Sequence, residues 1–293
     1  MPRLLPLALA QLPPRPYTDT VAAYASEVET LLAAHPGTKL VAFPELHLCG
    51  VEGTEAERNE QLNAAAQPLD GPRTRQLAQL AGDLDVWLAP GSVCERGDDG
   101  ELFNIALVFS PEGHLAARYR KIFPWRPYEP YEPGDRFVVV ELAEFGRLGF
   151  SICYDAWFPE VARHLAWLGA ELVLNPVQTT TADRAQELVL ARANAITNQV
   201  FVASVNTASP VGMGESILVD PEGMVLGQVP GAEPGVLART IDLDDVARVR
   251  RDGTAGVTRV WDHFAPGDSP LELPLYQGRI EPGRWRPRAG GAR

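Results

Sequence analysis

The sequence has few cysteines, and no two of them are closely spaced. Its three cysteines, Cys49, Cys94 and Cys153, form no CxxC motif, which argues against both a disulfide framework and a zinc ribbon. His47 stands two residues before Cys49, but no second closely spaced pair of metal ligands accompanies it. We therefore expect reduced thiols and no metal site.

Long apolar runs and long basic stretches are also missing. No uninterrupted apolar segment reaches about 18 residues, and no basic segment precedes an apolar one near the first residue, so we expect no membrane span and no secretory signal. The net charge is -12, whereas a protein that binds nucleic acid needs a basic face. These absences predict a cytoplasmic protein that binds neither membranes nor nucleic acid.

A serine-hydrolase elbow is incomplete in this chain. The sequence GFSIC at 149–153 places Cys153 where the G-x-S-x-G motif requires its second glycine. A serine hydrolase of that type is therefore a poor fit.

What the sequence does contain is an alternation of strand and helix patterns in two similar halves. With 293 residues, 45% of them hydrophobic, the chain can fill one large core. Each half ends on a strand hairpin whose turn contains Pro-Glu-Gly, at 111–113 and at 221–223. Because such alternation requires both faces of a sheet to be buried, we expect an α/β protein with a four-layer αββα sandwich.

The expected elements cover most of the chain. Strands are predicted at 4–9, 39–43, 86–93, 103–109, 115–119, 137–142, 147–152, 171–174, 200–205, 216–219 and 224–228, and helices at 20–34, 73–84, 159–168 and 182–198. From residue 265 the sequence is rich in proline, glycine and arginine and lacks periodicity. We expect one domain over 1–264, followed by a C-terminal arm or tail over 265–293.

Three polar side chains follow predicted strands at the points where those strands end. Glu45 follows the strand 39–43, Lys121 follows the strand that begins at Leu115, and Cys153 follows the strand 147–152. Ligands of α/β sheets gather beyond the carboxyl ends of strands. Each of these residues alone has a structural interpretation, as a solvated carboxylate, a surface cation or a small core residue.

Together, the three segments carry a family resemblance. FPE at 43–45, YRK at 119–121 and GFSICYD at 149–155, followed by FPE at 158–160, resemble the three signature blocks of the nitrilase superfamily of carbon-nitrogen hydrolases. The resemblance implies the αββα fold and a catalytic triad of Glu45, Lys121 and Cys153. It also implies paired helices in an even-numbered homo-oligomer, most simply a homodimer.

A fourth block favours one branch of this superfamily. PWRPYEPYEPG at 124–134 is similar to the segment after the lysine in aliphatic amidases and formamidases, which maps a second glutamate onto Glu129, with Glu132 as the competing residue. True nitrilases typically have Trp-Glu after the nucleophile, where this chain has Tyr-Asp, so the resemblance favours an amidase. Tyr154, Trp157 and Tyr128 are candidate substrate-binding residues, although aromatic residues in such loops also serve simply to pack.

The expected chemistry is cysteine-dependent hydrolysis of a small non-peptide amide to a carboxylic acid and ammonia or an amine. A thiol is mostly protonated at neutral pH, so Glu45 is expected to act as its base, and no metal or organic cofactor is required. Four alternatives remain open, namely a hydrolase of N-carbamoyl compounds, a nitrilase, an acyltransferase with the same triad, and a catalytically silent interaction protein.

Overall fold

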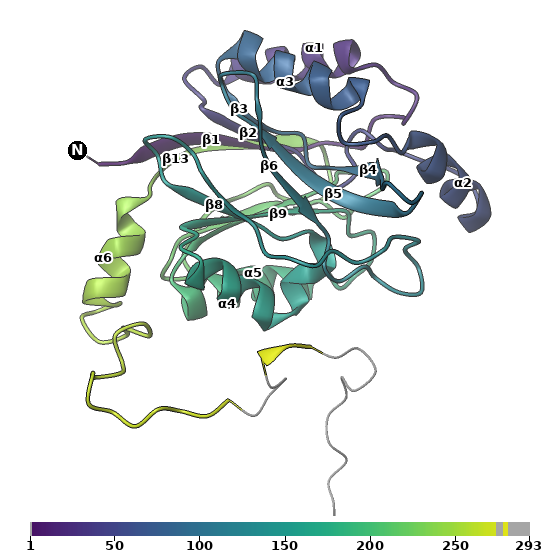
Figure 1. Cartoon of the computed structure of the whole chain (residues 1–293). Helices are drawn as coiled ribbons and strands as arrows, with labels where there is room; N and C mark the ends of the chain where they lie inside the picture. Colours follow the sequence, from purple (N-terminus) through teal and green to yellow (C-terminus); the bar gives the residue numbers. More distant parts are fainter. Residues whose placement is uncertain (1, 274–277, 281–293) are drawn as a thin grey trace, which may run out of the picture. The chain divides into compact units, whose positions relative to one another are not determined.

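Two β-sheets packed face to face form the centre of the computed structural model, which describes residues 2–273 and 278–280 (Figure 1). Residues 1–260 form the first of two units into which the chain divides, and residues 261–293 form the second. The domain boundary expected at residue 264 stays a prediction. Of the expected arm 265–293, residues 274–277 and 281–293 lie outside the described residues.

The first sheet combines parallel central strands with antiparallel edges. Its path is β13-β1-β2-β3-β5-β4, and β6 also pairs with β5. The strands are β1 (Leu4–Gln11), β2 (Leu40–Ala42), β3 (Trp87–Ala89), β4 (Ser92–Arg96), β5 (Leu102–Phe109), β6 (Leu115–Arg120) and β13 (Gly235–Asp242). Helices α1 (Val21–Ala34) and α3 (Pro72–Leu84) cover its outer face (Figure 1).

The second sheet has the path β12-β11-β10-β9-β8-β7. Its strands are β7 (Val139–Glu141), β8 (Arg147–Phe150), β9 (Leu172–Val177), β10 (Phe201–Asn206), β11 (Ile217–Val219) and β12 (Val225–Gln228). Helices α4 (Pro159–Trp167) and α5 (Arg184–Asn198) lie on its outer face, so the predicted four-layer αββα sandwich is confirmed (Figure 1).

The alternation of side chains along each strand separates two cores. In β1, Leu5, Leu7 and Leu9 point between the sheets, whereas Ala8 and Ala10 face the helices. The two-residue period of a strand produces this division. The core between the sheets also draws on both halves of the chain, including Leu40, Ala42, Leu148, Phe150, Leu172, Leu174, Phe201 and Ala203.

Several elements differ from those expected. The predicted strand 86–93 is two strands, β3 and β4, because the chain turns at Pro90 and Gly91. Helix α2 (Glu55–Ala65), which begins with a capping box at Thr54, helix α6 (Asp244–Asp252) and strand β13 were not expected. Strand β13 pairs with β1 along its whole length, so a segment from the second half completes the sheet of the first half.

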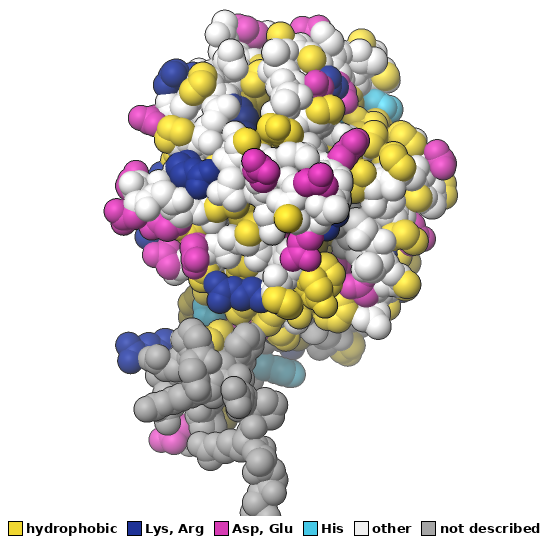
Figure 2. Space-filling view, turned by 90° about the vertical axis from the view of Figure 1, so that its right-hand side faces the viewer, with side chains coloured by type: hydrophobic (Ala, Val, Ile, Leu, Met, Phe, Trp, Pro, Cys, Tyr) yellow, Lys and Arg dark blue, Asp and Glu magenta, His cyan; other side chains and the backbone are white. Residues whose placement is uncertain are grey.

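Within the described residues, no helix combines the length and the apolar character that crossing a membrane requires. On the face shown in Figure 2, Asp and Glu side chains are scattered over the surface, and Lys and Arg side chains lie mostly on the left-hand side of the view. That face therefore presents mixed charge.

The turn at Gly91 supports the segment that carries Glu45. Gly91 has φ +83°, and a Cβ atom added there would overlap the carbonyl oxygen of Pro44. The next residue, Ser92, accepts a 3.0 Å hydrogen bond at its Oγ from the backbone nitrogen of Leu46. Only glycine fits this close approach of two backbones.

Replacing Gly91 with alanine tests this close approach. We expect Gly91→Ala to lower the free energy of unfolding by at least about 2 kcal/mol more than Gly100→Ala does, because only the first substitution forces a backbone overlap. Gly100 is a matched control, since it has φ +90° and no atom within 4 Å of an added Cβ. Urea unfolding of both variants measures the difference, and equal losses would show that the turn yields to the extra methyl group.

Candidate active site

The four residues expected to act in catalysis come from four separate segments. Glu45 begins the turn after β2, Lys121 directly follows β6, Glu129 lies in the loop after it, and Cys153 begins the short 3-10 helix η1 (Cys153–Trp157) after β8. Two of these segments belong to the first half of the sandwich, one is the loop between the halves, and one belongs to the second half. Their convergence therefore depends on the packing of one sheet against the other.

Lys121 lies between two carboxylates. Its Nζ donates to Glu45 Oε1 at 3.0 Å and to the two carboxylate oxygens of Glu129 at 2.8 and 2.9 Å. The lysine side chain is fully buried, and that of Glu45 is 2% exposed. A buried ammonium group is costly unless it is paired and hydrogen-bonded, and here all its contacts are charge-assisted.

The carboxylate of Glu45 is held on both of its oxygens. Oε1 accepts from Nδ2 of Asn104 at 2.8 Å as well as from Lys121, and Oε2 accepts from the backbone nitrogen of Gln178 at 2.9 Å. The backbone carbonyl oxygen of Asn104 also accepts a 2.9 Å hydrogen bond from the backbone nitrogen of Lys121. Glu45 is therefore fixed from β5, from the residue that follows β9 and from Lys121 at once.

Burial sets the protonation preferences of this cluster. Burial and the nearby carboxylate of Glu129 raise the pKa of Glu45, although Lys121 opposes them. Burial alone would lower the pKa of Lys121, but Glu45 and Glu129 outweigh it and raise that pKa well above its ordinary value. Lys121 therefore stays an ammonium group, while Glu45 is a stronger base than an exposed glutamate.

Cys153 stands close to these groups as a neutral thiol. Burial of the sulfur, followed by the negative charge of Glu45, raises the pKa of Cys153 well above its ordinary value. Interaction with the thiol in turn lowers the pKa of Glu45. The pair is thus arranged for proton transfer from sulfur to carboxylate.

The backbone at Cys153 is left-handed and is held by Asp155. Cys153 has φ +46°, an uncommon conformation for a residue with a side chain. The buried carboxylate of Asp155 accepts from the backbone nitrogens of Ile152 at 2.9 Å and Phe123 at 2.8 Å, and from the hydroxyl of Tyr119 at 2.8 Å. Asp155 therefore ties the turn at Cys153 to the segments on both sides of Lys121.

Burial raises the pKa of Asp155 to about 6, while its hydrogen bonds and the charge of Lys121 oppose the rise. Asp155 is consequently ionised at neutral pH. In that state the carboxylate can accept all three hydrogen bonds that it receives.

Glu129, and not Glu132, contacts Lys121. Glu129 also accepts at Oε2 from the backbone nitrogen of Trp125 at 2.8 Å, which closes the loop onto its own carboxylate. The side chain of Glu132 is 56% exposed and lies 3.7 Å from Arg126. Geometry thus distinguishes two glutamates that the sequence left as alternatives, and the catalytic role of Glu129 stays a prediction.

The three aromatic candidates lie in different environments. Tyr154 and Trp157 are half-buried beside Cys153, with ring centroids 6.1 Å apart, and Tyr154 also packs edge-on against Phe158 at 5.2 Å. Tyr128 is 58% exposed and packs on Trp125 at 4.4 Å. Tyr154 and Trp157 lie in the same short helix as Cys153. Contact with a substrate stays a prediction for all three aromatic residues.

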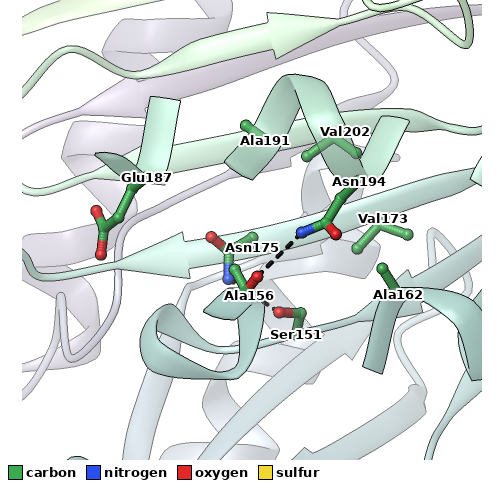
Figure 3. A pocket seen from close by; sticks show the side chains of 9 residues that line it. All are labelled: Ser151, Ala156, Ala162, Val173, Asn175, Glu187, Ala191, Asn194 and Val202. Carbon is green, nitrogen blue, oxygen red and sulfur yellow. Dashed lines mark hydrogen bonds between the residues drawn. The ribbon is translucent and has the colours of Figure 1, made fainter. Parts of the chain in front are cut away.

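A cavity of about 20 Å³ lies beside η1 (Figure 3). It is lined by Ser151, Ala156, Ala162, Val173, Asn175, Glu187, Ala191, Asn194 and Val202. About 10 to 15 Å³ is enough to hold one water molecule, so this cavity is far too small for a substrate. A hydrogen bond from Nδ2 of Asn194 to the carbonyl oxygen of Ala156, 3.0 Å long, anchors η1 to α5 at its edge.

Sequence reasoning assigned no role to Asn104, Gln178 or Asp155. Asn104 is the one polar residue within the apolar run LFNIAL of β5, which is a usable signal. Asp155 was part of a recognised block without a role of its own. Gln178 holds the Glu45 carboxylate through its backbone N–H, and its side chain donates a longer hydrogen bond of 3.5 Å to the Glu45 carbonyl. A side-chain pattern in the sequence cannot reveal the backbone contact.

A base, an ammonium group and a neighbouring thiol can together carry out acyl transfer. The thiol can attack a carbonyl carbon, the carboxylate can take up and return a proton, and the ammonium group can stabilise a developing negative charge. None of these steps requires a group other than the side chains described.

Comparison with known proteins agrees with this chemistry. The family model for carbon-nitrogen hydrolases matches residues 6–251. A formamidase of Pseudomonas syringae pv. tomato is 31% identical over 255 residues, which are 83% of this chain and 73% of the relative. The human omega-amidase NIT2 is 33% identical over 236 residues, which are 75% of this chain and 82% of the relative.

A solved structure extends the comparison to the fold. An amidase from Nesterenkonia sp. AN1, in a mutant form with the acetamide moiety of fluoroacetamide covalently added at its active-site cysteine, superposes with a TM-score of 0.66. The two chains are 26% identical, and the match covers 84% of this chain and 94% of the other. The chain therefore belongs to the carbon-nitrogen hydrolase family, in the amidase-like branch of the nitrilase superfamily, and is a hydrolase of carbon-nitrogen bonds other than peptide bonds.

Proposed function

We propose that the protein hydrolyses a small, uncharged, non-peptide amide to a carboxylic acid and ammonia or an amine through a thioester on Cys153. The observation that supports this most strongly is the buried contact of Lys121 with Glu45 and Glu129 beside the thiol. The three contacting groups carry two negative charges and one positive charge, so an anionic substrate would be repelled. A neutral amide is the better match.

The first half of the reaction forms the thioester. Glu45 takes the proton of Cys153 as the sulfur attacks the amide carbon, and a tetrahedral intermediate results. Glu45 then gives that proton to the departing nitrogen, and the carbon-nitrogen bond breaks. A raised pKa suits a carboxyl group that must first accept a proton and then donate it.

The second half uses the same carboxylate on water. Glu45 removes a proton from a water molecule that attacks the thioester, and the carbon-sulfur bond breaks to release the acid and restore the thiol. The leaving sulfur takes that proton back from Glu45, which returns the site to its starting state. In both halves the oxyanion would be stabilised by Lys121 and by the backbone N–H of Tyr154, and the loss of one such donor typically costs about 100 to 1,000-fold in rate. Lys121 can supply an N–H if Glu129 keeps one of its two hydrogen bonds.

The names of the relatives support this class of substrate. Formamidase and omega-amidase are both amide hydrolases by name, and the related amidase carries an acetamide moiety on its cysteine. Ammonia release from a panel of small amides, N-carbamoyl amino acids and nitriles would identify the substrate. Turnover of the carbamoyl compounds or nitriles alone would contradict the proposal.

Cys153→Ala tests the nucleophile. We expect this variant to fold normally and to release no detectable ammonia from an amide that the wild type hydrolyses, because the substitution removes the nucleophile. Cys94→Ser is the matched control, since its thiol lies in β4 outside the cluster, and it should retain activity. Near wild-type turnover by the Cys153 variant would disprove the triad.

Glu129→Gln tests the second carboxylate. We expect amide turnover to fall by about 100-fold, because Lys121 and the substrate carbonyl lose their alignment with the sulfur. Iodoacetamide should still alkylate Cys153, which separates loss of positioning from loss of the fold. Glu132→Gln is the control and should be near wild type, so a reversed result in steady-state kinetics would assign the role to Glu132.

We further propose a homodimer or a larger even-numbered assembly. Large apolar side chains on and next to α4 and α5 are exposed, namely Trp167 by 74%, Leu168 by 50%, Val189 by 65% and Ile196 by 41%. Exposed apolar patches often mark interfaces. Light scattering at micromolar concentration should give at least twice the chain mass of 31.9 kDa, and a mass equal to one chain would contradict the proposal.

A further inference from the structure

Two cysteines outside the candidate active site form a buried thiol pair. Cys49 lies just after the turn that carries Glu45, and Cys94 lies in β4. Cys49 is 1% exposed and Cys94 is fully buried. The sulfur of Cys49 accepts a hydrogen bond from the backbone nitrogen of Cys94 at 3.4 Å, so that sulfur already lies against the residue that carries the other thiol.

An arginine holds the thiol pair from α3. Nη1 of Arg73 lies 3.7 Å from the sulfur of Cys49, and Nη2 donates to the carbonyl oxygen of Cys94 at 2.5 Å. A hydrogen bond from Cys94 and the charge of Arg73 lower the pKa of Cys49 to about 6 against the effect of burial, whereas burial and Cys49 raise the pKa of Cys94. The pKa values of the two sulfurs are thus shifted in opposite directions, and Cys49 is the more readily ionised of the two.

A cavity of about 170 Å³ reaches this arginine. It is lined by Pro16, Tyr17, Asp19, Thr20, Val21, Leu48, Gln67, Pro72, Arg73 and Gln76. Thr20, Pro72 and Gln76 are exposed, so the cavity opens to solvent, and Leu48 is the neighbour of Cys49 in the chain. A small oxidant in the cavity would therefore contact Arg73, whose guanidinium group also lies against the sulfur of Cys49.

We propose that Cys49 and Cys94 are a redox modification site, which a hydroperoxide converts to a reversible disulfide that lowers the activity of the neighbouring active site. The contact of the Cys49 sulfur with the backbone of Cys94, the cation beside that sulfur and the cavity that reaches Arg73 are the features that favour this reaction. Disulfides of this transient kind also occur in reducing compartments.

The reaction balances with the hydroperoxide as the only co-reactant. The thiolate of Cys49 attacks one peroxide oxygen, so that a sulfur-oxygen bond forms, the oxygen-oxygen bond breaks, and the leaving oxygen takes a proton from solvent. Cys94 then attacks the sulfenic sulfur, so that the sulfur-sulfur bond forms and hydroxide leaves with the proton of the thiol as water. Two thiols and one hydroperoxide give one disulfide, one water and one alcohol, or two waters from hydrogen peroxide.

The thiol pair is joined to the active site through two short connections. Cys49 follows Glu45 by four residues in the same turn, and Cys94 is the register partner of Asn104, whose side chain donates to Glu45. A disulfide requires the sulfurs to close to about 2.05 Å. That movement draws the turn and β4 together at the point where Glu45 is positioned, and small misplacements of a reacting group are costly.

The cross-link itself is tested without any activity measurement. Cys153→Ala protein is treated with hydrogen peroxide, free thiols are alkylated, and the protein is digested without reductant for mass spectrometry. We expect a peptide pair joined through Cys49 and Cys94 that disappears with dithiothreitol and is absent from Cys49→Ser/Cys153→Ala. Two thiols that remain open to alkylation after treatment, or a cross-link that forms only in denaturant, would overturn the proposal.

The effect on turnover rests on the proposed function and has a separate test. Wild type and Cys94→Ser are oxidised in parallel, so that oxidation of Cys153 itself is common to both. For each protein, kcat after oxidation is divided by kcat of the reduced form. We expect this ratio to be about tenfold lower for wild type than for Cys94→Ser, and we expect dithiothreitol to abolish the difference. Equal losses would overturn the switch, whereas absence of turnover in the reduced wild type would overturn the proposed function and leave the cross-link result standing.

Discussion

The buried contact of Lys121 with Glu45 and Glu129 is the interaction on which the rest of the site depends. Removing any one of these groups from water is unfavourable, and such a cluster is stable only when every member is paired and hydrogen-bonded. The chain meets this condition with Asn104, the backbone of Gln178 and the backbone of Trp125. The same burial that makes the cluster costly raises the pKa of Glu45 and so makes it a suitable base.

The fold supplies this cluster by joining the two halves of the chain. Glu45 and Lys121 follow strands of the first sheet, and Cys153 follows a strand of the second. Asp155 holds the two sides together through Phe123 and Tyr119. The turn at Gly91 packs against Pro44, the residue before Glu45, and so supports the segment that carries this carboxylate. Stability and reactivity therefore depend on the same contacts between sheets.

Sequence reasoning predicted the layers, the two hairpins and the three segments at strand ends, because hydrophobic periodicity and short motifs are local properties. It read residues 86–93 as one strand because both halves are apolar, and only the close approach of Gly91 to Pro44 shows why the chain must turn there. The pairing of β13 with β1 and the hydrogen bond from the backbone of Gln178 are tertiary features. A single sequence carries no local signal for either of them.

The pH dependence of kcat/KM for a small amide tests the central claim most directly, since it reports the ionisation of the free enzyme. If Glu45 is the base for a neutral thiol, activity is lost as the pH falls through the pKa of Glu45. The account therefore predicts an acidic limb with its midpoint above the ordinary glutamate value of about 4.3, followed by a plateau through neutral pH. A rate that instead rises across neutral pH with a midpoint near the ordinary thiol value of about 8.5 would contradict it, because a preformed thiolate would then attack without Glu45.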